Sequence, residues 1–560
     1  MSGQDTPLRG QEKPLRGQEK DLGGREKALS GQGAPAFTSD LGDGTYRNPV
    51  LNADWSDPDL LRVGDDYYLT ASSFGRAPGL PLLHSRDLVN WTLVGHALQR
   101  LEPAREFRKP RHDCGVWAPS LRHHDDRFWI FWGDPDHGIY QVNAPGIRGP
   151  WTRPHLIKAG RGLIDACPLW DEDTGEAYLV HGWARSRSGI KNRLTGHRMR
   201  PDGTGLLDEG KLIVDGDRIP GWFTLEGPKL YRHDGWFWIF APAGGVETGW
   251  QGAFRSRGFF GPYEERVVLE QGDTDVNGPH QGGWVSTPSG EHWFAHFQQK
   301  GAYGRVVHLQ PMRWGKDGWP VIGDEGTPVA VHRKPDLPRQ PLSAPATDDD
   351  FPGGRFGRQW QWTANPQDGW ATQHSGDGLR LACVRSADAH DPRKLPSVLT
   401  QRLPGAPCTV EVELRLDAEE PGARAGLAVL GDAFSWIGLE RGADGTVHLV
   451  HRFAESVAER ERDAAHPRMA PEGRVRLRIE AGTGARCRFS YDLGGGWEPS
   501  GQVFAATPWR WVGALLGLFG VAPSGGGHAG SATFTRFRIT AREAVGSAAD
   551  EIARSTAPPA

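Results

Sequence analysis

A fivefold repeat of one strand–turn–strand unit constrains the fold of this chain more than any other feature. Each unit starts near an acid or a proline, passes through an apolar stretch to a polar turn, and returns in an aromatic strand. The units start at Asp57, Ala118, Asp165, Glu226 and Trp284. Prolines mark the first four starts, at Pro58, Pro119, Pro168 and Pro228. Hairpins that recur about every 50–60 residues are typical of a five-bladed β-propeller with about four strands per blade.

The composition supports this interpretation, because 76 Gly, 43 Pro and 23 Trp favour short strands and tight turns over long helices. The alternative for the repeats is a β-sandwich whose hairpins are similar by coincidence. Five units in phase favour the propeller.

A second β-rich region follows a connector rich in proline and charge that starts at His332. Apolar and polar residues alternate strictly in four of its segments, residues 409–416, 446–453, 474–481 and 532–540. Alternation between glycine-rich turns, without helical periodicity, predicts an antiparallel β-sandwich. The fold class expected for the whole chain is therefore all-β.

Five regions follow from these patterns: an extension over residues 1–44, the propeller over 45–325, a linker over 326–346, the sandwich over 347–542 and a flexible tail over 543–560. The extension repeats a seven-residue unit with one leucine each, which suggests a coiled coil. Gly and Pro in the repeats oppose a helix, so we expect disorder instead.

Charge and cysteine content exclude several classes of function. The net charge of −4 leaves no basic excess for binding nucleic acid. The five cysteines are odd in number and contain no CxxC pair, which argues against a zinc site or a disulfide framework. No apolar stretch reaches the length of a membrane span, and the N-terminus lacks the apolar segment of a signal peptide. We therefore expect a cytoplasmic protein with no membrane partner, while the oligomeric state is left open.

Three of the five repeats start with an acid, namely Asp57, Asp165 and Glu226. The first residues of innermost strands converge on the axis of a propeller, so these carboxylates are expected to share one cavity. Like charges in one cavity raise at least one pKa, which allows a protonated acid beside an ionised base. Glycoside hydrolysis requires that combination, and an inverting enzyme separates the two groups by roughly 6.5–9.5 Å. The alternative for each acid is a solvated or turn-capping carboxylate.

At these residues the chain resembles glycoside hydrolase family 43, the inverting β-xylosidases and α-L-arabinofuranosidases. The similar stretches, in the order typical of the family, are residues 46–74, 80–91, GVWAPSL (115–121), LIDACPLW (163–170), LEGPKLYRHDGWFWIF (225–240) and 304–323. Together they cover nearly all of the expected propeller. The second region resembles the accessory domain of many members, which implies a β-sandwich of the jelly-roll or concanavalin-like type.

The resemblance implies that Asp57 is the general base and Glu226 the general acid. Asp165 would orient that acid and tune its pKa. Two departures from the family pattern are visible: Asp57 lies in DPD where DPS is common, and Ala-Cys separates Asp165 from its proline. The second departure leaves the pose of Asp165 open.

The resemblance also assigns binding residues. Arg305 matches an arginine that contacts sugar hydroxyls, and its planar guanidinium suits a vicinal diol; the alternative is a surface ion pair. The resemblance also places His280 among the substrate-binding residues. It matches a central histidine that in relatives binds a hydrated cation, often calcium, so a structural calcium ion is the one cofactor considered. Calcium prefers oxygen ligands, so water would supply most of the shell. The alternative for His280 is a hydrogen-bonded core histidine.

Trp117 and Phe74 match aromatic residues that wall the sugar pocket, with core packing as the alternative for each. Trp509 and Trp511, in the second region, are candidates to reach back over this pocket, as a sandwich loop does in some relatives.

The function predicted is an exo-acting hydrolase that removes terminal β-D-xylosyl or α-L-arabinofuranosyl units, with inversion. Its substrates would be xylan-, arabinan- or arabinoxylan-derived oligosaccharides, and its chemistry needs no cofactor. A retaining fructan-type hydrolase with Asp57 as nucleophile is the first alternative. A non-catalytic sugar-binding protein is the second.

Overall fold

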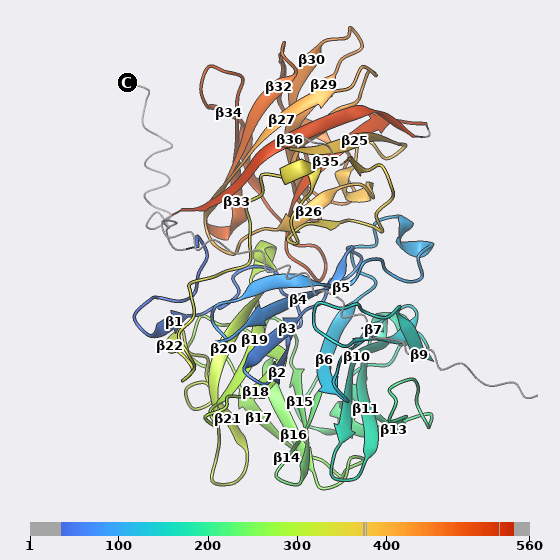
Figure 1. Ribbon diagram of the computed structural model, residues 1–560, viewed down its shortest axis with the longest axis vertical. Coiled ribbons are helices and arrows are strands. Elements are labelled where there is room, and N and C mark those ends of the chain that lie inside the picture. Colours follow the sequence, from blue (N-terminus) through green and yellow to red (C-terminus); the bar gives the residue numbers. More distant parts are fainter. Residues whose placement is uncertain (1–34, 373–375, 377, 526, 543–560) are drawn as a thin grey trace, which may run out of the picture. The chain divides into compact units, whose positions relative to one another are not determined.

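The computed structural model describes residues 35–372, 376, 378–525 and 527–542. Within this part of the chain, five separate four-stranded sheets are followed by one large sheet system (Figure 1). The propeller predicted from the repeats and the sandwich predicted from the alternating segments are both confirmed. No helix in the described residues has the length and apolar character of a membrane span.

Each blade is an antiparallel meander whose strands follow one another in chain order. Blade 1 contains β2 (Asp59–Val63), β3 (Asp66–Thr70), β4 (Gly79–Ser85) and β5 (Thr92–Leu98). Blade 2 contains β6 (Trp117–His124), β7 (Arg127–Asp134), β8 (Gly138–Ala144) and β9 (His155–Ala159). Blade 3 contains β10 (Leu163–Asp171), β11 (Glu176–Trp183), β12 (Arg193–Met199) and β13 (Lys211–Asp215). Blade 4 contains β14 (Lys229–His233), β15 (Trp236–Ala243), β16 (Trp250–Ser256) and β17 (Glu264–Leu269). Blade 5 contains β18 (His280–Ser286), β19 (His292–Gln299), β20 (Arg305–Trp314) and β21 (Pro320–Ile322).

Two contacts between distant parts of the chain close the propeller. Strand β1 (Thr45–Arg47) pairs with β22 (Val331–Arg333), which follows the last blade. The backbones of Leu51 and Val307 then exchange two hydrogen bonds, of 3.2 and 3.0 Å, so that the segment before blade 1 is held against blade 5. This closure places the start of blade 1 beside Arg305.

All five blades start with a residue in the left-handed backbone region. The φ angles are 54° at Asp57, 38° at Ala118, 59° at Asp165, 62° at Gly227 and 40° at Gln281. In β2 and β14 the pairing with the next strand begins two residues after the left-handed residue, at Asp59 and Lys229. In β10 the pairing is irregular between Ile164 and Cys167, on either side of the left-handed Asp165. A left-handed residue beside a bulge redirects the side chains around it. The blade starts therefore share one unusual geometry.

This geometry corrects the alignment of the repeats. Glu226 precedes the left-handed position, which Gly227 occupies, so it is not equivalent to Asp57 and Asp165. Pro168 lies two positions further along its strand than the other prolines do, three residues after the left-handed Asp165 instead of one, and it already pairs with Leu179 in the sheet. A proline pattern shows that strands begin, but it does not show how the backbone turns into them.

The second domain is built from strands β23 to β36. They are β23 (Gln361–Trp362), β24 (Ala371–Thr372), β25 (Leu379–Ser386), β26 (Leu399–Arg402), β27 (Cys408–Asp417), β28 (Arg424–Leu430), β29 (Phe434–Arg441), β30 (Val447–Ala454), β31 (Arg462–Met469), β32 (Arg474–Ala481), β33 (Arg486–Asp492), β34 (Glu498–Ala505), β35 (Leu515–Pro523) and β36 (His528–Ala541). The main path runs β31-β30-β29-β28-β35-β25-β36-β27-β32-β33-β34. All named pairs are antiparallel except β25 with β35, which is parallel.

Alternation along the strands explains why this domain folds as a sandwich. In β27, Val410, Val412 and Leu414 are buried in the core, while Glu411 and Glu413 between them face outward. Glu411 pairs with Arg478 of the neighbouring strand β32. One face of the strand is thus buried by the hydrophobic effect and the other is solvated.

Short helical turns connect the strands. They are η1 (Glu106–Arg108), α1 (Arg185–Ser188), η2 (Gly216–Arg218), η3 (Gly301–Tyr303), η4 (Pro352–Gly354), η5 (Pro392–Lys394) and η6 (Thr483–Ala485).

Residues at two predicted boundaries are more ordered than expected. In the predicted extension, Asp40 is buried and accepts hydrogen bonds from Asn90 and Lys334. In the predicted linker, β22 pairs with β1. The heptad repeats in residues 1–34 and the tail over 543–560 lie outside the described residues.

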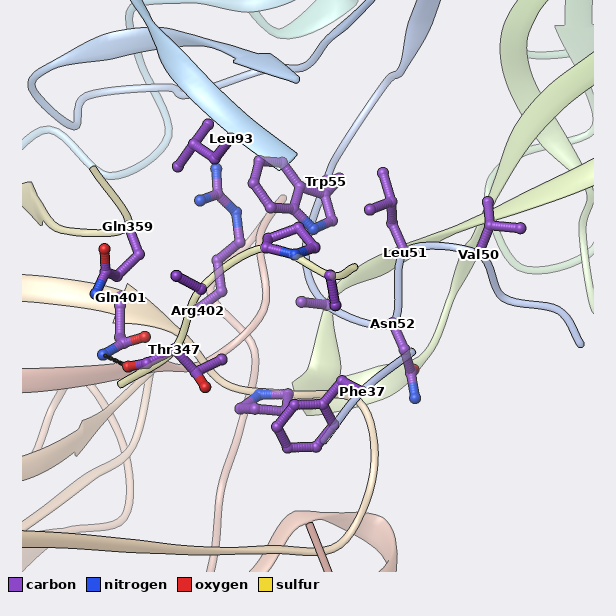
Figure 2. Close-up of a pocket in the computed structure, with 15 residues that line it drawn as sticks. Phe37, Val50, Leu51, Asn52, Trp55, Leu93, Thr347, Gln359, Gln401 and Arg402 are labelled. Carbon is purple, nitrogen blue, oxygen red and sulfur yellow. Dashed lines mark hydrogen bonds between the residues drawn. The ribbon is translucent and has the colours of Figure 1, made fainter. Parts of the chain in front are cut away.

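Arg402 of the second domain packs against the propeller, beside a cavity of about 50 Å³ (Figure 2). Its guanidinium carbon lies 3.8 Å from the centroid of the Trp55 ring, and its Nε donates to the backbone oxygen of Asp54 at 2.6 Å. Trp55 and Asp54 directly precede the first blade. The second domain therefore supports the segment that leads into Asp57.

Candidate active site

Asp57 is held by three donors at the start of blade 1. The hydroxyls of Ser72 and Ser56 donate to its Oδ2 at 2.6 and 3.0 Å. Arg305 Nη1 donates to its Oδ1 at 2.5 Å. Ser72 also accepts a hydrogen bond from the backbone N–H of Ala118 at 2.7 Å, which ties Asp57 to blade 2. These hydrogen bonds fix the orientation of the Asp57 carboxyl group from two sides.

Arg305 is positioned from several sides at the start of β20. Its backbone N–H donates to Asp54 Oδ1 at 3.0 Å, and its Nη1 also donates to Ser56 Oγ at 2.9 Å. Its guanidinium lies 4.6 Å from the centroid of the Phe297 ring. The side chain is 7% exposed, so Arg305 is a buried cation paired with Asp57, and not a surface ion pair.

Asp165 and Glu226 lie side by side at the starts of blades 3 and 4. The backbone N–H of Gly227 donates to Asp165 Oδ2 at 2.8 Å, so Asp165 fixes the residue that follows Glu226. A Cβ on Gly227 would approach the Gln281 side chain to 2.7 Å. Only glycine satisfies both its left-handed φ of 62° and this close approach.

The two carboxyl groups both hold protons more strongly than ordinary acids. Burial, with the charges of Glu226 and Asp57, raises the pKa of Asp165 to about 8. Burial raises the pKa of Glu226 to about 7; Arg305 opposes the rise and Asp57 adds to it. The Glu226 side chain is 30% exposed, but it faces a cavity rather than open solvent. A proton donor and an Arg-paired carboxylate therefore coexist here near neutral pH.

His280 lies behind Glu226, with its Nε2 3.6 Å from Glu226 Oε1. It is fully buried, and burial lowers its pKa to about 3, so the imidazole is neutral. Neither ring nitrogen has a hydrogen-bond partner among the described residues. His280 is not part of the cavity wall, in contrast to its predicted contact with substrate.

The described residues offer calcium no direct ligand set. No group of three or more His, Cys, Asp or Glu side chains among them is arranged to hold a metal ion. The unpartnered nitrogens of His280 fit ordered water instead. Calcium prefers oxygen ligands, so the ring nitrogens of His280 offer it no direct coordination.

One cavity of about 230 Å³ collects the predicted catalytic residues. Its wall also contains the predicted residues Phe74, Trp117 and Arg305. The Phe74 and Trp117 ring centroids are 6.1 Å apart. Pockets for drug-sized ligands usually measure roughly 300–1,000 Å³, so this cavity is small.

The second domain adds Arg510 and Trp511 to the same wall. The Trp511 ring meets the Trp117 ring edge to face, with centroids 6.0 Å apart. Trp509 does not line the cavity; it stacks on His112 at 3.9 Å. Of the two candidate tryptophans, the structure thus places Trp511 at the pocket and Trp509 in the contact beside it.

Matches to protein families agree with this geometry. The model of glycosyl hydrolases family 43 matches residues 46–320, and that of the beta xylosidase C-terminal concanavalin A-like domain matches residues 348–540. The chain belongs to glycosyl hydrolases family 43. It is therefore a glycoside hydrolase.

Three curated relatives of this family 43 hydrolase cover most of its length. A protein of Xylanibacter ruminicola named "Putative beta-xylosidase" is 39% identical, over 71% of this chain and 73% of the relative. A beta-xylosidase of Formosa agariphila is 31% identical, over 86% of this chain and 88% of the relative. A non-reducing end alpha-L-arabinofuranosidase of Bacteroides ovatus is 28% identical, over 70% and 75% respectively.

Several residues that build the site of this hydrolase were not identified from its sequence. Asn192 is one: its Oδ1 accepts from the backbone N–H of Leu225 at 2.8 Å, and its Nδ2 donates to the backbone oxygen of Trp222. Asn192 thereby fixes the segment that carries Glu226. Gln281, the left-handed residue that starts blade 5, was also missed, because neither an acid nor a proline lies directly beside it in the sequence.

Proposed function

We propose that the chain is an exo-acting, inverting hydrolase of terminal β-D-xylosyl or α-L-arabinofuranosyl units. Its substrates are oligosaccharides derived from xylan, arabinan or arabinoxylan. The observation that carries the proposal is the pairing of Asp57 with Arg305 in one cavity with Glu226, whose pKa is raised to about 7. The names of the relatives, two of them beta-xylosidases and one a non-reducing end arabinofuranosidase, support the choice of sugars.

In the reaction, Glu226 donates its proton to the glycosidic oxygen as the bond to the anomeric carbon breaks. A water molecule attacks that carbon from the opposite face, and Asp57 accepts the proton that the water loses. The products are the free sugar with inverted configuration and the shortened oligosaccharide. Solvent afterwards returns a proton to Glu226 and removes one from Asp57.

The position of the two groups in the propeller supports inversion. Asp57 belongs to the start of blade 1 and Glu226 to the start of blade 4, and these blades are not consecutive in the ring. Acids from separate blades leave a gap that a water molecule can enter. In this proposal Asp165 is a positioning residue: its Oδ2 accepts a hydrogen bond from the backbone N–H of Gly227, the residue after Glu226, and its own pKa is raised to about 8.

The proposed binding residues are Arg305, for sugar hydroxyls, and the aromatic rings of Phe74, Trp117 and Trp511, which pack on apolar sugar faces. The small cavity suits one terminal unit rather than an internal stretch of polysaccharide. We also propose that the chemistry needs no cofactor, since the carboxyl groups supply both proton transfers. A calcium ion, where present, has a structural role through water bound to His280.

Proton NMR of the first-formed anomer tests the mechanism. Aryl β-D-xyloside and aryl α-L-arabinofuranoside are supplied separately, and spectra are recorded before mutarotation. We expect the anomer opposite in configuration to the substrate, and the faster substrate identifies the preferred sugar. Retention would assign Asp57 as a nucleophile and support the fructan-type alternative.

A further inference from the structure

Three cationic side chains line the cavity outside the carboxylate groups. They are Arg185 in α1, Lys191 in the loop after it, and Arg510 in the loop before β35. All three residues are exposed. They come from two segments, the connection between β11 and β12 in the propeller and a loop of the second domain, yet they share one cavity.

None of these three cations has an acidic partner among the described residues. The Arg510 guanidinium carbon lies 5.2 Å from the centroid of the Trp511 ring. By contrast, the nearby Arg187 pairs with Asp136 and Asp113. The chain as a whole carries a net charge of −4, so the local positive excess does not follow from its composition.

The position of two of these cations relates them to the leaving group. Lys191 directly precedes Asn192, whose side chain fixes Leu225 and thus the segment of Glu226. Arg185 begins the helical turn that follows blade-3 strand β11. A general acid protonates the leaving oxygen, so the departing part of the substrate lies on the Glu226 side of the cavity.

We propose that this side of the pocket binds an anionic leaving group, namely the carboxylate of a uronic acid carried by a xylo-oligosaccharide. The inference rests on the proposed function, and it names the substrate class for the part of the site beyond the cleaved bond. A guanidinium fork matches a carboxylate with two parallel hydrogen bonds, and an ammonium group adds a point charge. Exposed cations within one cavity attract such a group before the sugar is bound.

The test uses two substrates of nearly equal shape, 4-carboxyphenyl and 4-carbamoylphenyl β-D-xyloside. The first carries a carboxylate and the second a neutral amide. The quantity measured is the ratio of their kcat/KM values, in the native protein and in the triple variant Arg185→Gln, Lys191→Gln, Arg510→Gln. Arg153→Gln, which changes an exposed arginine outside the cavity wall, is the matched control.

We expect the carboxylate-to-amide ratio to fall about tenfold in the triple variant, since three partly solvated ion pairs each contribute a modest amount. The control should keep the native ratio. In the native protein the ratio should also fall when salt is raised to about 0.5 M, because screening weakens exposed charge pairs. The loss should appear mainly in KM.

An unchanged ratio in the triple variant, with the amide substrate still hydrolysed, would overturn this inference alone and show that the three cations are merely solvated. Absence of hydrolysis of both xylosides, and of the matching pair of arabinofuranosides, would overturn the proposed function and the inference with it. A xylo-oligosaccharide with a uronic acid on its second unit, compared with the undecorated oligosaccharide, repeats the test with natural sugars.

Discussion

The protonation of Glu226 is expected to control hydrolysis above neutral pH. With its pKa raised to about 7, about half of the molecules carry the proton at pH 7. A glutamate with the reference pKa of 4.5 would carry it in only about 0.3% of molecules at this pH. The environment of Glu226 therefore increases the competent fraction about 150-fold at pH 7. Above about pH 8, kcat/KM should fall about tenfold per pH unit.

The assay compares two substrates that differ in their need for an acid. Phenyl β-D-xyloside has a poor leaving group that requires protonation, whereas 2,4-dinitrophenyl β-D-xyloside departs without it. We expect the alkaline decline with the phenyl compound and a much weaker decline with the dinitrophenyl compound. In Glu226→Gln, kcat/KM for the phenyl compound should fall about 10²–10⁴-fold, as expected for loss of a general acid. The dinitrophenyl compound should lose far less.

The neighbouring Asp165, with a pKa of about 8, titrates together with Glu226. The decline of kcat/KM at alkaline pH therefore reflects the ionisation of both carboxyl groups. Glu209→Gln, which changes a fully exposed acid on the surface, is the control and should leave both profiles unchanged. A flat profile for the phenyl compound between pH 6 and 9 would refute the reasoning. So would an alkaline decline that persists in Glu226→Gln, because another group would then supply the proton.

Three further predictions concern stability and metal dependence. Asp165→Asn should be more stable than the native protein by about 1–3 kcal/mol near pH 8, measured by denaturant unfolding, and this gain should be smaller near pH 5. The reason is that the pKa of Asp165 is about 8 in the folded protein and lower in the unfolded chain. The stability of the native protein therefore falls as the pH rises from the unfolded value to the folded value. A gain that does not grow with pH would contradict this. Gly227→Ala should lose about 1–3 kcal/mol of stability and at least tenfold in kcat/KM, because its Cβ would meet Gln281. Gly64→Ala is the control: Gly64 has a similar φ of 61° but open space around it, so this variant measures the cost of the left-handed backbone alone. Incubation with EDTA should leave kcat within about twofold, because carboxyl groups perform both proton transfers; loss of kcat that calcium restores would disprove this.

The sequence predicted the propeller because the blade hairpins repeat in phase, and it predicted Asp57 and Asp165 because both start a repeat. Glu226 was found through the same pattern, although the backbone places it one residue before the equivalent position. That shift depends on a left-handed Gly227, which a residue pattern does not reveal. The predicted place of Trp511 relied on resemblance rather than on any local signal.

Residues outside the repeats were not predicted because loops bring them together. Asn192, Lys191 and Arg185 lie in or near the connection between two strands of blade 3, and Arg510 belongs to the second domain. None of these residues lies in a periodic segment of the sequence, and each is an amino acid that is common on protein surfaces. Their shared cavity depends on tertiary packing alone.

The contribution of Arg510 and Trp511 to the cavity has a consequence for how such enzymes diversify. Recombination between genes often exchanges whole domains, and an accessory domain is the natural unit to exchange. Here an exchange would replace part of the pocket wall, and through Arg402 it would also alter the support of the segment before Asp57. We therefore expect the two halves of this protein to be inherited together, with changes in leaving-group preference arising in the loop before β35 while the carboxyl groups stay as they are.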